Sequence, residues 1–207
     1  MSDELLDRTA ILKQLEGILE IQVRISGYVD KRLCLQCYSG PEVEWETRRK
    51  HAFKDVRGLV DKYAFSKMIP RDEFGILTLS VTSHLLNIQH TLLRVLVMID
   101  TIRGESFDDI FMDSMMNISS KVNEQIAELK RMVNYRTIGA EQAEQSLETI
   151  LRLEREIDED NIVICRQISV VTKGESDFNC YMMRKIVAEL EHISDYAREA
   201  AEILSEM

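Results

Sequence analysis

Residues 182–204 read MMRKIVAELEHISDYAREAAEIL, and the spacing of the apolar residues in this stretch decides the fold class. They recur every three or four positions, at Met182, Ile186, Leu190, Ile193, Ala197, Ala200 and Leu204. This period is typical of an α-helix that buries one face and leaves the others polar. The same pattern appears at Ile150, Leu153, Ile157, Ile164 and Ile168. Both segments are therefore predicted to be long amphipathic helices.

Residues that end helices are scarce and fall at regular intervals. The 207 residues include two prolines and eight glycines. The strongest breakers are spaced 30 to 35 residues apart, at Gly40-Pro41, Pro70, Gly104, Gly139 and Gly174. Since helix-forming sequence fills each interval, we expect an all-α protein of six long antiparallel helices joined by short turns.

Charge and composition limit the class of protein. The formal net charge of −10 repels phosphate backbones, so we expect no nucleic acid as a partner. The first residues are acidic where a signal peptide is basic, and the most apolar run, residues 92–99, is too short and polar to span a bilayer. Four cysteines without a secretory signal indicate reduced thiols. We therefore expect a cytoplasmic protein, and any association with a membrane is expected to be peripheral.

Short matches about 104 residues apart indicate an internal duplication. The sequence PRDEF begins at Pro70, and the similar sequence GESDF begins 104 residues later at Gly174. Asp55 likewise lies 103 residues before Asp158. We expect one domain spanning the whole chain, built of two related halves of three helices each, about 1–104 and 105–207.

Pairs of acidic residues border the apolar faces of the last two predicted helices. Glu154 and Asp158 are four residues apart, as are Glu191 and Asp195, and Glu199 lies one turn further on. Residues at i and i+4 share a helix face, so antiparallel packing of these helices would bring four carboxylates together. Like charges at that separation repel, and a multivalent cation bound by carboxylate oxygens relieves the repulsion.

The alternative is a solvated acidic face with basic partners on the same helices. Arg155, Arg184 and Arg198 are placed along the sequence to neutralise the acids. Acidic pairs at i and i+4 are also common on long helices of acidic proteins. The spacing leaves both interpretations open.

The acidic pairs resemble the motifs of a known family. The sequence E-x-x-x-D at 154–158, followed by L-E-x-x-x-D-Y-A-x-E at 190–199, is similar to PhoU. It is more similar still to the PhoU-like proteins that accompany phosphate transporters, the Pit-accessory type. Asp55 and the segment I-P-R-D at 69–72 resemble a stretch of that branch in the first half. The resemblance covers roughly residues 45–205.

The resemblance implies a fold of two three-helix bundles side by side and a role in regulating the uptake of inorganic phosphate. It implies a non-enzymatic protein that binds a phosphate transporter or a signalling protein at the cytoplasmic face of the membrane, and we expect a homo-oligomer. It also implies a multinuclear metal cluster of iron, zinc or another divalent ion. The residues that match the metal-binding motifs are Glu154, Asp158, Glu191, Asp195 and Glu199.

The first half departs from the family pattern. His51 stands where an acid is expected before Asp55, and the third predicted helix has no carboxylate over residues 83–90. That stretch contains His84 and His90 instead. A softer metal held by these three histidines and Asp55 is therefore a second candidate site. The alternative is that the four residues are ordinary hydrogen-bonded polar positions.

Two other functions stay open. A carboxylate-bridged di-iron enzyme or iron-binding bundle is one, because residues 189–192 form an E-x-x-H motif. Such bundles use two of these motifs, and this chain has one. A helical adaptor without metal is the other. Cys34 and Cys37 have C-x-x-C spacing but lack the second pair that a structural zinc site needs, so we expect incidental thiols near a helix end.

Overall fold

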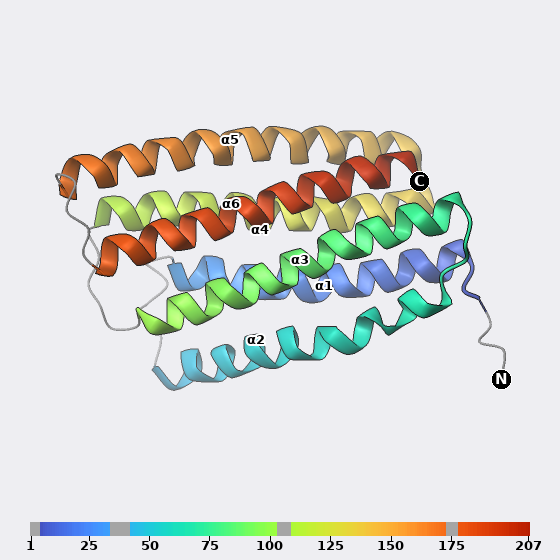
Figure 1. Cartoon of the computed structure of the whole chain (residues 1–207), viewed down its shortest axis with the longest axis horizontal. Coiled ribbons are helices and arrows are strands. Elements are labelled where there is room, and N and C mark those ends of the chain that lie inside the picture. The colour runs from blue at the N-terminus through green and yellow to red at the C-terminus, as the bar shows by residue number, and fades with distance from the viewer. Residues whose placement is uncertain (1–4, 34–41, 103–108, 173–177) are drawn as a thin grey trace.

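The structure is a computed structural model that describes residues 5–33, 42–102, 109–172 and 178–207. These residues form helices and no strand, which confirms the all-α prediction. Consecutive helices run antiparallel (Figure 1). They are α1 (Arg8–Leu33), α2 (Glu42–Lys62), the 3₁₀ helix η2 (Tyr63–Met68), α3 (Glu73–Thr101), α4 (Asp109–Ile138), α5 (Ala140–Thr172) and α6 (Phe178–Glu206).

Two predicted breakers lie within the described residues, and both separate helices. Gly139 is the single residue between α4 and α5, and Pro70 lies between η2 and α3. The apolar period did not predict η2, because a short 3₁₀ segment leaves little trace in a pattern of this kind. The remaining breakers and the C-x-x-C pair lie outside the described residues: Gly40, Pro41, Gly104, Gly174, Cys34 and Cys37.

The turn that precedes α3 is closely packed. Asp72 caps the helix, since its side chain accepts a hydrogen bond of 2.8 Å from the backbone N–H of Gly75. Gly75 is buried, and a Cβ atom there would lie 1.8 Å from the carbonyl oxygen of Pro70. This turn therefore requires a glycine for steric reasons.

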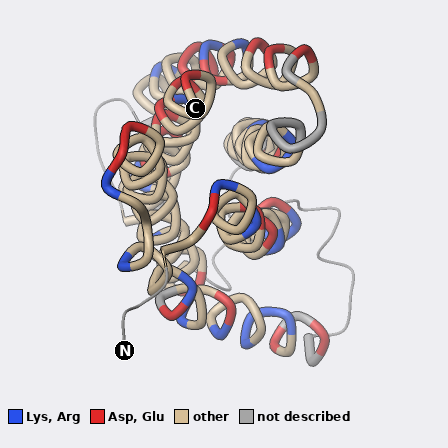
Figure 2. Tube along the Cα trace, turned by 90° about the vertical axis from the view of Figure 1, so that its right-hand side faces the viewer, with Lys and Arg blue, Asp and Glu red and all other residues tan. Residues whose placement is uncertain are grey.

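The helices share one core that runs through both halves of the chain. α1 packs against α2 and α3, α4 packs against α5 and α6, and contacts from α1 to α4 and from α3 to α6 join the two sets. Seen end-on, α1 and α4 lie inside a curved row made by α2, α3, α6 and α5 (Figure 2). The seven apolar residues that predicted α6 are all buried, at 7% exposure or less. The helix face inferred from their spacing is therefore the face that packs.

Two buried glutamines occupy matching places in α1 and α4. Gln22 donates a hydrogen bond of 2.6 Å to the carbonyl of Leu85 in α3. Gln125, 103 residues later, donates to the carbonyls of Ile150 in α5 and Ser194 in α6, each at 3.3 Å. Both side chains are 0% exposed, and buried amides without partners are costly, so these bonds help to fix the helix register. Their spacing agrees with the predicted duplication, which stays a prediction.

Candidate functional site

Four acidic residues meet where α5 packs on α6, and we call them the carboxylate seam: Glu154, Asp158, Glu191 and Asp195. They border the buried stripes of the two helices and are partly buried themselves. Each of Glu154 and Asp158 on α5 feels the charge of Asp195 on α6, and Glu191 feels the charge of Asp158. The two sequence pairs are therefore within electrostatic reach of each other across the helix interface.

Burial and repulsion from neighbouring acids disfavour the charged form of three of these groups, Glu154, Asp158 and Glu191. Burial raises the pKa of Glu154, and the charges of Asp158 and Asp195 raise it further. Burial and Asp195 raise the pKa of Asp158, while burial, Asp158 and Asp195 raise the pKa of Glu191. A group with a raised pKa among like charges is a candidate for binding either a proton or a cation.

Two of the four carboxylates have partners that offset part of this repulsion. Nε of Arg198 lies 3.0 Å from Oε1 of Glu154, and Arg198 lowers the pKa of that residue. Nδ2 of Asn161 donates a hydrogen bond of 2.6 Å to Oε2 of Glu191. Asp158 and Asp195 make neither a hydrogen bond nor an ion pair with any residue that the structure describes. Arg198 also lowers the pKa of Asp158 through its charge, so the two aspartates are the carboxylates of the seam without a direct partner among the described residues.

The seam has the donor chemistry of a cation site but not yet the arrangement of one. Carboxylate oxygens suit hard and borderline divalent ions. Within the described parts of the chain, however, no three His, Cys, Asp or Glu side chains are placed so that they could hold a metal ion. Binding would therefore require side chains of the seam to rotate toward a common point.

Glu199 turns away from the seam and toward α3. Its Oε2 lies 3.1 Å from Nδ1 of His84, and its Oε1 lies 3.8 Å from Arg198. The His84 ring also lies against Tyr196, with 6.3 Å between ring centroids. Glu199 therefore links α6 to α3, although its sequence position suggested a fifth member of the acidic site.

The second candidate site, formed by His51, Asp55, His84 and His90, is not assembled. Asp55 on α2 faces α1, where its Oδ2 lies 3.4 Å from Arg24. His84 on α3 faces α6, and the side chains of His51 and His90 are exposed. The reason is packing: α3 presents the His84 face to α6 rather than to α2. The expectation that these four residues meet is therefore corrected.

The sequence suggested Arg198 as a basic partner of the acids, but it gave no signal for Lys121 and did not identify which acid Arg198 contacts. Lys121 on α4 joins two acids of α5, with Nζ at 3.2 Å from Glu156 and 2.8 Å from Asp160. Arg198 makes the corresponding contact from α6 to Glu154. No motif identifies such residues, because the pairs are 35 or more residues apart in the sequence. Of the two cysteines described, Cys165 is exposed and Cys180 is buried.

Comparisons with known proteins do not assign this chain to a family. No family model, no curated protein and no solved structure matches the chain. Among the described helices, none is both long enough and apolar enough to cross a membrane.

Proposed function

We propose that this protein is a non-enzymatic regulator of inorganic phosphate uptake, with a PhoU-like fold of two three-helix bundles. It acts at the cytoplasmic face of the membrane by binding a phosphate transporter or a signalling protein through its helix faces. The observation that supports the proposal is the carboxylate seam, which brings together the acidic motifs that resemble that family: Glu154, Asp158, Glu191 and Asp195. Together with the six antiparallel helices, it matches what the resemblance implies.

In this proposal a divalent cation offsets the charge of the seam and ties α5 to α6. Asp158, Glu191 and Asp195 would hold it, because Glu154 already has Arg198 as a cationic partner. The bound ion would supply positive charge to carboxylates whose repulsion opposes helix packing. The ion would therefore stabilise the packing of α5 on α6 and the surface that binds a partner.

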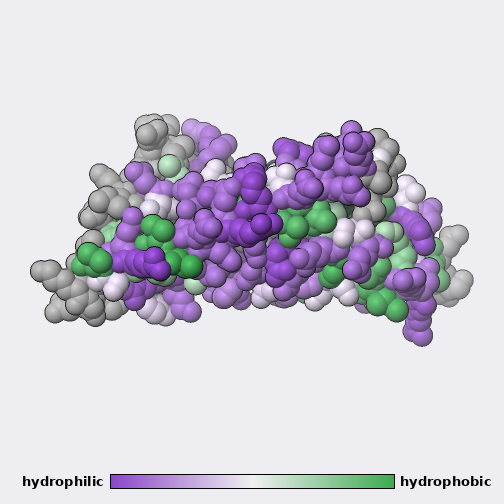
Figure 3. All heavy atoms as spheres, turned by 90° about the horizontal axis from the view of Figure 1, so that it is seen from above, coloured by the Kyte–Doolittle hydropathy of each residue, from purple (hydrophilic) through white to green (hydrophobic). Residues whose placement is uncertain are grey.

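Exposed apolar residues supply a surface for the partner. Val170 near the end of α5 and Phe178 and Tyr181 at the start of α6 are exposed. These helix ends lie at the same end of the molecule (Figure 1). Apolar residues also stand out in small groups on the otherwise hydrophilic face that carries α5 (Figure 3). Exposed apolar patches rimmed by polar residues are typical of protein interaction sites.

A helical adaptor without metal is the second candidate. The ion pair from Arg198 to Glu154 and the hydrogen bond from Asn161 to Glu191 favour it, because they satisfy half of the seam without a cation. In this case the seam carries a net negative charge that the partner itself neutralises.

The experiment is to delete the gene in the native host and to measure the rate of phosphate uptake. We expect a changed rate that the wild-type gene restores. A V170S/Y181S variant should fail to restore it, whereas the matched variant I76S/L79S, which removes two exposed apolar residues of α3, should succeed. An unchanged uptake rate in the deletion strain would refute the proposed function.

Calorimetry with Mn²⁺, Fe²⁺ and Zn²⁺ separates the two candidates. A cation site predicts binding to the wild type that is lost in D158N/D195N and kept in the control E148Q, an exposed position of α5. Absence of binding at millimolar metal selects the adaptor without metal.

A further inference from the structure

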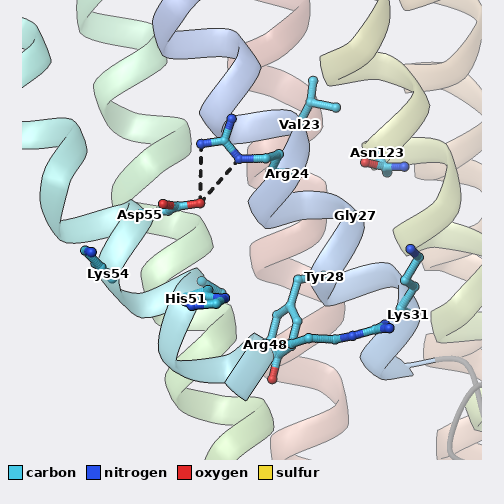
Figure 4. Close-up of a pocket in the computed structure, with 11 residues that line it drawn as sticks. Val23, Arg24, Gly27, Tyr28, Lys31, Arg48, His51, Lys54, Asp55 and Asn123 are labelled. Carbon is cyan, nitrogen blue, oxygen red and sulfur yellow. Dashed lines mark hydrogen bonds and ion pairs between the residues drawn. The ribbon is translucent and has the colours of Figure 1, made fainter. Parts of the chain in front are cut away.

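An open groove of about 730 Å³ runs between α1 and α2 and reaches α4, away from the carboxylate seam (Figure 4). Its wall combines apolar surface with several basic side chains, and we call it the basic groove. Its charged and titratable residues are Arg24, Lys31, Arg48, His51, Lys54 and Asp55. Its other lining residues are Val23, Gly27, Tyr28, Ala52 and Asn123.

The groove concentrates positive charge in a protein of net charge −10. Four lysine and arginine side chains line it, against one carboxylate, Asp55, which is already paired with Arg24. Lys31, His51 and Lys54 make no hydrogen bond or ion pair within the described parts of the chain. Arg24 and Arg48 already have acidic partners, Asp55 and Glu44, so Lys31 and Lys54 are the cations best placed to receive an anion.

The basic side chains are distributed along the groove rather than around one point. Arg24 and Lys31 are seven residues apart on α1, and Arg48 and Lys54 are six apart on α2. At 1.5 Å per residue these spacings correspond to about 10 Å along each helix. That length exceeds a single phosphate group and suits a chain of two or three phosphoryl groups. The side chain of Arg48 extends from α2 past Tyr28 toward the position of Lys31 on α1 (Figure 4).

Small residues keep the groove open. A Cβ atom at Gly27 would meet Oδ1 of Asn123 at 3.6 Å and nothing else nearby, so no side chain fills this part of the wall. Ala52 is buried on the opposite helix. A phosphoryl chain could therefore approach both helices. The lysines would act as point charges, and Arg48 would exchange its partner Glu44 for phosphoryl oxygens.

We propose that the basic groove binds a short anion with two or more phosphoryl groups, as inorganic oligophosphate or as the phosphate chain of a nucleotide. A long nucleic acid is disfavoured, because a polymer would also meet the acidic remainder of the surface, whereas a short anion meets only the local field. This inference goes beyond the proposed function and does not depend on it. The groove uses none of the seam residues, and its binding is measured without a transporter.

The first test is calorimetric titration of the purified full chain with sodium tripolyphosphate in buffer without divalent metal. The double variant K31A/K54A removes two groove cations. K13A/K62A removes two exposed lysines from the same two helices outside the groove, so both proteins have the same net charge. We expect at least about tenfold weaker binding in K31A/K54A, since contacts to charged groups are among the stronger ones, and little change in K13A/K62A.

The second test blocks the groove without removing a cation. Gly27→Glu places a carboxylate in the hollow, and Gly17→Glu adds the same charge to α1 where a Cβ would have nothing within 4 Å. We expect G27E to lose tripolyphosphate binding and G17E to keep most of it. Thermal unfolding of all four variants checks that they remain folded.

Titrations with pyrophosphate, orthophosphate and ATP identify the source of the phosphoryl chain. Equal affinity for tripolyphosphate and ATP assigns an inorganic chain, and tighter binding of ATP assigns a nucleotide, whose base would lie on Tyr28. In both cases orthophosphate must bind more weakly than tripolyphosphate. The proposal is overturned if tripolyphosphate does not bind at millimolar concentration, or if the two lysine doubles lose affinity equally.

Discussion

The basic groove between α1 and α2 and the carboxylate seam between α5 and α6 both gather like charges where two antiparallel helices meet, and the sign is opposite. The seam residues are partly buried, so their repulsion acts on the protein itself and raises pKa values. Lys31, His51 and Lys54 in the groove are exposed, so water and salt screen their repulsion. The depth of burial thus decides whether gathered charges affect folding or ligand affinity.

The largest effect on stability is expected at Gln22 and Gln125, the buried glutamines that occupy matching places in the two halves. Gln125→Ala should lower the free energy of unfolding by about 2–4 kcal/mol, because it opens a cavity and removes the donor that joins three helices. Gln22→Ala should cost nearly as much. Urea unfolding measures both, with the exposed Gln142→Ala as control. A small loss for Gln22→Ala alone would mean that the two halves are not stabilised in the same way.

Removing one arginine from the seam should lower the free energy of unfolding more than removing one arginine from the groove. Arg198→Ala leaves Glu154 beside Asp158 and Asp195 without its cation, and the Arg198 and Glu154 side chains are 28% and 16% exposed. We expect a loss of about 1–2 kcal/mol in unfolding free energy. Arg24→Ala in the groove, at 52% exposure, should change it by about 0.5 kcal/mol or less.

The exposed Arg184→Ala is the control on α6 for chemical unfolding of these variants. Equal losses for Arg198→Ala and Arg24→Ala would contradict the role given to burial.

The pH dependence of stability should reflect the seam. Glu154, Asp158 and Glu191 have pKa values raised by burial and by neighbouring acids, so the folded protein binds more protons than the unfolded chain above about pH 4. Their contribution to stability is therefore lost as the pH rises through this window. Glu191→Gln should stabilise the protein at neutral pH by a few tenths to about 1 kcal/mol, and not below the unfolded pKa.

Unfolding curves at three pH values, with Glu148→Gln as the exposed control, provide the measurement. A wild type that gains stability relative to Glu191→Gln as the pH rises would show that the seam is not repulsive.

The smallest effect concerns the single acid of the groove. Asp55→Asn releases Arg24 and should tighten tripolyphosphate binding by about two- to fivefold, since an exposed ion pair contributes little. Asp61→Asn, an exposed position on the same helix, changes the net charge equally and should leave the affinity nearly unchanged. Calorimetry compares the two, and equal gains would assign the effect to net charge rather than to the groove.

Apolar spacing predicted the helices well because it reports which face of a helix is buried. The stripe from Met182 to Leu204 is buried throughout α6, and Gly139 separates α4 from α5 as expected. Spacing does not report which helix covers that face. The packing of α3 on α6 and of α1 on α4 therefore had no signal in the apolar pattern, and neither did the contact of His84 with Glu199.

The same limit applies to the charged sites. The i, i+4 spacing placed Glu154 and Asp158 on one face, and the structure puts that face toward α6. Asp55, 103 residues before Asp158, instead faces α1 and pairs with Arg24. Gln22 and Gln125 have the same spacing and make similar contacts, so the spacing alone does not predict which contacts two residues make. The basic groove was missed because its cations lie on two helices and form no motif within either.

The turn at Gly75 has a consequence for how descendants of this sequence will diverge. Any side chain there would collide with the Pro70 carbonyl, whereas exchange of an exposed charge costs little folding free energy. A few nucleotide changes can thus erase the acidic motifs or reverse the sign of the groove while the fold persists. The glycine of this turn should outlast them, so it is the better guide to relatedness among distant sequences.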